Sequence, residues 1–197
     1  MTGEVSETDA ELVVSSREGD ADAFGRLVSR HQDYIYNAVV YLVGRGPEAD
    51  DITQEVFLKA FRGLDGFKGR SRFSTWLYKI MLNCVRSRWR RESRRPEFMS
   101  LEAGGDEDAS PPDPEDYVED GPVTRMVRKE RVRIVRECIA GMKPKLREVL
   151  VLRDLQGLAY EELAETLEVP LGTVKSRLAR ARAKLRDRIE PRLSGEW

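Results

Sequence analysis

Residues 160–182 read YEELAETLEVPLGTVKSRLARAR, and this stretch decides the fold class of the chain. Its apolar residues recur at spacings of three and four in two short runs, as they do on the inner faces of helices. Pro170 and Gly172 separate the runs, and the small Ala164 allows the two helices to cross closely. The sequence therefore predicts a helix-turn-helix, with helices over about 160–167 and 173–189. The inward positions are Leu163, Ala164, Leu167, Val174, Leu178, Ala181 and Leu185.

Two residues of this motif carry local predictions. Thr173 stands where a helix N-cap is expected, because a threonine hydroxyl can accept a hydrogen bond from a backbone N–H of the first turn. Glu168 stands in the tight turn, where the expected left-handed backbone costs a residue with a Cβ atom about 1 kcal/mol relative to glycine. We therefore expect the backbone of Glu168 to be strained and the fold to tolerate this cost.

The second helix of the motif has a polar, basic outer face. A face of this kind is typical of a recognition helix in the DNA major groove, where Lys and Arg pair with guanine O6 and N7. Arg177 is expected to contact the DNA backbone. The other interpretation is an amphipathic hairpin within a plain helical bundle. The outward residues are Lys175, Ser176, Ala179, Arg180 and Arg182.

The rest of the chain also has helical periodicity, and no strand-like alternation persists. We expect a helix over about 50–63, with an inner face formed by Ile52, Val56, Phe57, Ala60 and Phe61. The fold class is therefore all-α, with two small helical domains. The expected divisions are a tail with the start of the first helix (1–22), a first domain (23–96), a linker (97–123), a second domain (124–190) and a C-terminal tail (191–197).

Charge is segregated along the chain. Among 197 residues, 34 Lys and Arg face 35 Asp and Glu, giving a net charge of −1. Residues 101–122 hold nine acids and no Lys or Arg, so the remainder carries +8. Proline, glycine and like charges make this segment a predicted flexible linker. Eleven cations in 62–95 and seven in 171–188, with few acids among them, indicate a polyanionic partner.

Composition excludes several function classes. The chain has one histidine (His31), two distant cysteines (Cys84 and Cys138) and no phosphate-binding glycine motif, so we expect no enzyme, no cofactor and no metal. It has neither a signal peptide nor a run of about 20 apolar residues, so we expect a cytoplasmic protein without membrane contact.

Three segments together resemble bacterial RNA polymerase sigma factors of the extracytoplasmic-function (ECF) group, in the sigma-70 family. They are DDITQEVFLKAFRGLDGF (50–67), FSTWLYKIMLNCVRSRWR (73–90) and YEELAETLEVPLGTVKSRLARARAKLR (160–186). Each is moderately specific, and all three in order are strongly so. The resemblance implies a protein that binds core RNA polymerase, directs it to promoters through the −35 and −10 elements, and nucleates melting.

The resemblance also assigns roles to residues. The helix-turn-helix matches the −35 reader, and the loop 67–74 with Asn83 matches the −10 reader, which captures an extruded non-template base. It implies contacts with the β′ coiled coil and the β subunit, and an anti-sigma factor that covers both DNA-reading domains. The linker either threads toward the polymerase active-site cleft or is a passive tether. The predicted β′-docking residues are Asp51, Gln54, Glu55 and Phe57.

The chemistry of the loop suits melted DNA. An opened duplex needs cations for its phosphates, apolar surfaces in place of lost stacking, and polar groups for an exposed base edge. Phe67 and Phe73 are expected to supply the apolar surface, and Ser71 and Asn83 the polar groups. Trp76 is more simply a core residue. The cations are Lys68, Arg70, Arg72, Arg86 and Arg88.

Two rival interpretations remain. A stand-alone regulator that binds duplex DNA through the helix-turn-helix would explain residues 160–188, but it gives no use to the basic stretch 67–95 or to the polar face at 51–59. A pure protein-interaction module would make the basic faces incidental. A regulator should bind promoter DNA tightly by itself, whereas a sigma factor should do so mainly together with core polymerase.

Overall fold

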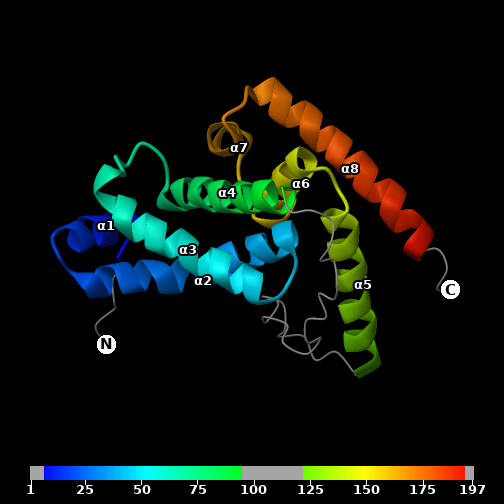
Figure 1. Cartoon of the computed structure of the whole chain (residues 1–197), viewed down its shortest axis with the longest axis horizontal. Helices are drawn as coiled ribbons and strands as arrows, with labels where there is room; N and C mark the ends of the chain where they lie inside the picture. The colour runs from blue at the N-terminus through cyan, green and yellow to red at the C-terminus, as the bar shows by residue number, and fades with distance from the viewer. Residues whose placement is uncertain (1–6, 95–121, 194–197) are drawn as a thin grey trace.

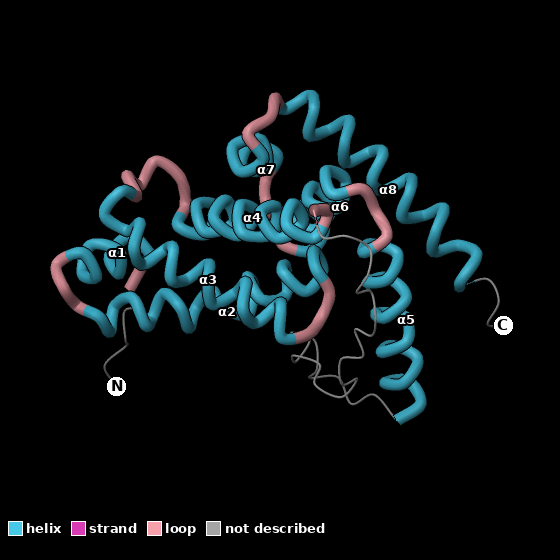
Figure 2. Tube along the Cα trace, viewed as in Figure 1, coloured by secondary structure: helices cyan, strands magenta, loops and turns pink. Residues whose placement is uncertain are grey.

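The computed structural model describes residues 7–94 and 122–193, and within these ranges it confirms the all-α class (Figure 2). The acidic segment predicted as a flexible linker falls almost entirely outside the described residues. The elements are α1 (Asp9–Arg17), α2 (Ala21–Val43), α3 (Pro47–Gly63), η1 (Leu64–Gly66), α4 (Phe73–Glu92), α5 (Pro122–Ala140), α6 (Pro144–Leu150), the π-helical turn η2 (Val151–Leu155), α7 (Tyr160–Leu167) and α8 (Leu171–Leu193).

The first domain is built on three long helices. In Figure 1, α2 and α3 lie side by side, and α4 lies between them and α7. Asp20 caps α2 by accepting hydrogen bonds from two backbone N–H groups, and Pro47 occupies the first turn of α3, where its missing N–H costs nothing. Leucines, isoleucine and methionine fill the fully buried centre: Leu27, Ile35, Leu42, Leu77, Met81 and Leu82.

Helix α1 was not predicted from the sequence as a separate element. It begins with a capping box in which Thr8 and Glu11 satisfy each other's backbone N–H groups. Leu12 and Val13 are buried against the first domain, so residues 9–17 belong to its packed part. Residues 1–22, expected to be a tail with the start of the first helix, therefore contain a separate docked helix.

The second domain stacks α5, α6, α7 and α8 around Val149, Leu150, Leu152, Leu163 and Leu178. Its core is continuous with that of the first domain, because α2 contacts α5 and η2, and α4 contacts α7. No helix in the described residues is long and apolar enough to cross a membrane.

Both cysteines are free and buried. Burial raises the pKa of the Cys84 thiol, and the Cys138 thiol contacts the backbone carbonyl of Arg188 at 3.6 Å. The thiolate is the reactive form, so both side chains should resist alkylation in the folded protein and react only after unfolding. Mass spectrometry after a short iodoacetamide pulse at pH 8, with and without urea, tests this. Fast modification without urea would contradict it.

Candidate nucleic-acid and polymerase interfaces

The helix-turn-helix forms largely as predicted. Helix α7 has the predicted bounds, and Glu168 ends it with φ 57° and ψ 47°, the left-handed conformation expected for this turn. The prediction for Thr173 was wrong, because α8 begins at Leu171 and Thr173 lies within its first turn. Its backbone N–H donates to the carbonyl of Pro170 at 2.8 Å.

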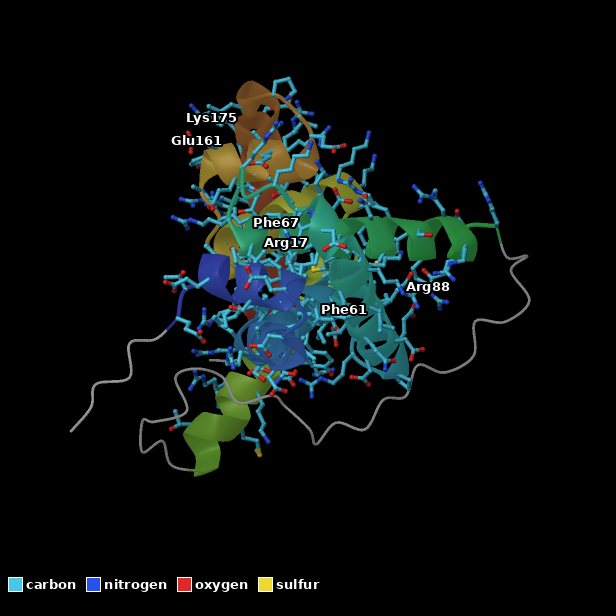
Figure 3. All side chains as sticks on the ribbon, turned by 90° about the vertical axis from the view of Figure 1, so that its left-hand side faces the viewer. Arg17, Phe61, Phe67, Arg88, Glu161 and Lys175 are labelled. Carbon is cyan, nitrogen blue, oxygen red and sulfur yellow. The ribbon has the colours of Figure 1, made fainter. Side chains whose placement is uncertain are left out.

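The predicted −35-reading residues lie on the outer face of α8. Lys175, Ser176, Ala179 and Arg180 are exposed, and Arg177 is half-buried at the edge of this face. Figure 3 shows Lys175 and Glu161 at the end of the molecule formed by the helix-turn-helix. Arg182, also predicted to face outward, is exposed and forms a two-point ion pair with Asp154 at 2.5 and 2.9 Å. Its guanidinium is already paired within the domain.

The loop between η1 and α4 exposes its cations and buries its aromatic rings. Lys68, Arg70 and Arg72 are exposed, and Arg72 has 80% of its side chain in contact with solvent. Ser71 is half-buried, and Asn83 on α4 is exposed.

Phe67 and Phe73 are 8% and 4% exposed, so in this structure their rings do not offer the stacking surface expected of them. Together with the half-buried Trp76 they form an aromatic cluster, with ring centroids 5.0–5.9 Å apart. The rings are buried because they pack on one another and so form the apolar contacts that fold the loop.

The predicted polymerase-docking residues flank an open groove of about 620 Å³ between α2 and α3. Asp51, Gln54 and Phe57 line it, whereas Glu55 pairs with Lys59 at 2.7 Å and raises the pKa of that ammonium group.

Sequence reasoning missed the apolar part of this groove. Phe61, predicted to be buried, is 54% exposed and packs edge-to-face on Phe24, with the ring centroids 5.0 Å apart. Leu58 is 50% exposed beside it. The sequence feature that could have predicted this apolar surface is Leu58, an apolar residue on the outward face of an amphipathic helix. The groove thus combines apolar and acidic side chains, which suits an amphipathic helix of a partner.

The two domains are joined by ion pairs that the sequence did not reveal. Arg86 on α4 donates from Nε and Nη2 to both carboxylate oxygens of Glu148, at 2.8 and 2.7 Å, and this contact raises the pKa of the guanidinium. The Glu148 side chain is only 3% exposed. Arg86, predicted to contact −10 DNA, is therefore bonded to the second domain in this structure.

Further contacts extend this interface along α4. Lys79 pairs with Glu168 of the helix-turn-helix turn at 2.7 Å and lowers the pKa of that carboxyl. The Thr75 hydroxyl donates to Glu162 at 3.2 Å, and the Tyr78 hydroxyl donates to Gln156 at 2.9 Å. Helix α4, which follows the predicted −10 loop, is thus covered by the domain that contains α7 and α8.

The described residues hold no group of three or more His, Cys, Asp or Glu side chains that could bind a metal ion. The candidate site therefore consists of two exposed basic surfaces and a groove.

Comparison with known proteins identifies the family. Residues 27–95 match the family model for Sigma-70 region 2, and residues 133–185 match that for Sigma-70, region 4. The ECF RNA polymerase sigma-E factor of Haemophilus influenzae is 37% identical over 186 residues, covering 93% of this chain and 96% of that protein. RNA polymerase sigma-H factor of Pseudomonas aeruginosa is 36% identical, with 95% and 96% coverage.

A solved structure with a similar fold is CnrH in complex with the cytosolic domain of CnrY, with a TM-score of 0.67 and 25% identity over 97% of this chain and 100% of that one. The chain belongs to the extracytoplasmic-function sigma factors of the sigma-70 family. It directs RNA polymerase to promoters, and its family consists of transcription initiation factors. The stand-alone regulator is not favoured, because region 2 is present as well as region 4.

Proposed function

We propose that the outer face of α8 reads the −35 element and that the loop 67–74, with Asn83, reads and opens the −10 element. The observation that carries the proposal is the exposure of both sets of polar and basic side chains on a chain with two sigma regions. Lys175, Ser176 and Arg180 supply base-edge contacts, and Lys68 and Arg70 supply phosphate contacts. The buried Phe67 and Phe73 give the loop its shape.

The groove between α2 and α3 docks the β′ coiled coil of core polymerase. Asp51 and Gln54 offer polar contacts on its rim, and Phe57, Leu58 and Phe61 offer apolar ones. Factors of this kind work where RNA polymerase is, in the cytoplasm, and redirect that enzyme without catalysing a reaction themselves.

Promoter binding requires the two domains to separate. The −35 and −10 elements lie about 25 base pairs apart, roughly 85 Å at 3.4 Å per pair. A compact chain of this length has a radius of gyration of roughly 16 Å, and its domains are joined here by direct side-chain contacts. A segment the length of residues 95–121 has a contour length of up to roughly 90 Å, which is sufficient for the separated domains.

An anti-sigma factor is the proposed inhibitor. CnrH, similar in fold over nearly the whole chain, was solved together with the cytosolic domain of CnrY. Purification of the tagged factor from native extracts should recover an inhibitory partner, and failure to recover one would count against this part of the proposal.

Run-off transcription tests the proposal as a whole. Purified core polymerase, this protein and a pool of genomic promoter fragments should yield discrete transcripts that require both proteins. Their start sites would identify the −35 and −10 sequences. Tight duplex binding by the protein alone, without transcripts, would overturn the proposal.

Replacing Arg180 by alanine should reduce promoter discrimination by about 1–3 kcal/mol if the guanidinium reads a base. Binding by the holoenzyme to the recovered promoter and to −35 variants measures this, with Arg186→Ala further along α8 as the control. Equal weakening on all sequences would instead make Arg180 a phosphate contact.

A further inference from the structure

Arg17, the last residue of α1, bonds to the backbone at the start of the −10 loop. Its Nε and Nη2 atoms donate to the carbonyl of Leu64 at 3.0 and 2.7 Å. Nη2 also donates to the carbonyls of Asp65 and Phe67. These carbonyls lie along η1 and at the residue that follows it, and the carbonyl of Leu64 also accepts from the backbone N–H of Phe67 at 3.0 Å. Figure 3 shows Arg17 next to Phe67.

Helix α1 is itself held firmly, so Arg17 starts from a fixed position. At the other end of the helix, Asp9 accepts from Arg30 at 2.6 Å and lies 2.8 Å from the His31 ring nitrogen, both on α2. Leu12 and Val13 are buried between these two anchors. Helix α1 lies outside residues 27–95, the part that matches region 2.

The middle of the loop has little structure of its own. Among the described residues, none of 68–71 takes part in a hydrogen bond that the structure shows, and Gly69 has a positive φ of 65°. The aromatic cluster packs Phe67, at the entry of the loop, against Phe73 and Trp76 at its exit. The path of the loop therefore depends on its two ends, and Arg17 holds the entry.

We propose that Arg17 is a positioning residue for the −10 loop. It fixes the entry backbone so that Lys68, Arg70 and Ser71 are presented to the unpaired strand in one conformation. Preorganisation of this kind improves affinity because less loop entropy is lost on binding. The inference rests on the proposed function of the loop and assigns α1 a part in promoter opening.

The test uses full-length variants bound to core polymerase. The probe is a fluorescent fork-junction DNA that carries the −10 non-template strand of a promoter recovered by run-off transcription. Arg17→Ala should bind this probe about tenfold more weakly, because the loop entry loses its charged hydrogen bonds and more loop entropy is then lost on binding. It should also discriminate less between the native captured base and a substituted one. Arg17→Lys should be intermediate, because a single ammonium group can still reach one carbonyl.

Arg26→Ala is the matched control, because Arg26 is an exposed arginine of the same domain that pairs with Glu7 and Asp20 and does not contact the loop. It should bind the probe like the wild type. The affinity for core polymerase should be unchanged in every variant, since Arg17 lies outside the groove between α2 and α3.

Two results would overturn the inference. The first is that Arg17→Ala binds the probe as well as the wild type does. The second is that this variant loses core-polymerase affinity and thermal stability together with probe binding, which would mean that Arg17 only stabilises the domain as a whole. The proposed function of the loop is tested separately by Lys68→Ala and Arg70→Ala. If these variants bind the probe like the wild type, the loop does not read the −10 strand, and the inference fails with it.

Discussion

Replacing Arg86 by alanine is expected to weaken the contact between the two domains by about 3–5 kcal/mol, because the buried Glu148 carboxylate loses its partner. Glu148 is 3% exposed and accepts both of its charged hydrogen bonds from this one guanidinium. Separation of the domains returns the carboxylate to water. The variant should therefore populate an open chain in which each domain stays folded.

Small-angle scattering of the isolated protein measures this opening as an increase in the radius of gyration. Arg88→Ala is the matched control: Arg88 is on the same helix, has the same 30% exposure, and pairs with Glu48 and Glu92 inside the first domain. It should leave the compact shape intact. Unchanged scattering in Arg86→Ala would show that the apolar contacts alone hold the domains together.

Replacing Leu163 by alanine is expected to destabilise the second domain by about 2–5 kcal/mol, the usual cost of emptying a fully buried leucine site. Leu163 is 0% exposed and packs where α7 crosses α8. A domain this small has only a few kcal/mol of stability in total, so much of the population should be unfolded, and −35 binding should be lost with it.

Urea unfolding followed by far-UV circular dichroism measures the change. Leu155→Ala, at a position 40% exposed in the same domain, should shift stability by no more than about 0.5 kcal/mol. A Leu163→Ala variant as stable as this control would mean that the helices of the second domain close over the missing side chain.

Much of the helix-turn-helix could be predicted from the sequence, because its determinants are local. The bounds of α7, the inward leucines and the backbone of Glu168 all follow from spacing and turn chemistry within about 25 residues. The predicted burial of Phe61 was wrong. Periodicity shows which face of a helix is apolar, but it does not show how far along the helix a neighbouring element covers that face.

The interface between the domains could not be predicted from local patterns. Arg86 and Glu148 are 62 positions apart, and each looks like an ordinary exposed charge within its own helix. The contacts of Arg17 are similar, because their acceptors are backbone carbonyls, which every residue carries. The roles of the exposed residues of α8 and of the −10 loop stay predictions until DNA binding is measured.

The strained backbone of Glu168 has a consequence for how this chain can be engineered. A glycine there would relax the turn and stabilise the isolated domain, but it would also remove the carboxylate that pairs with Lys79. A selection for thermal stability alone would favour that replacement. It would produce a more stable helix-turn-helix that is held less tightly against α4, and so a factor whose two domains come apart more readily.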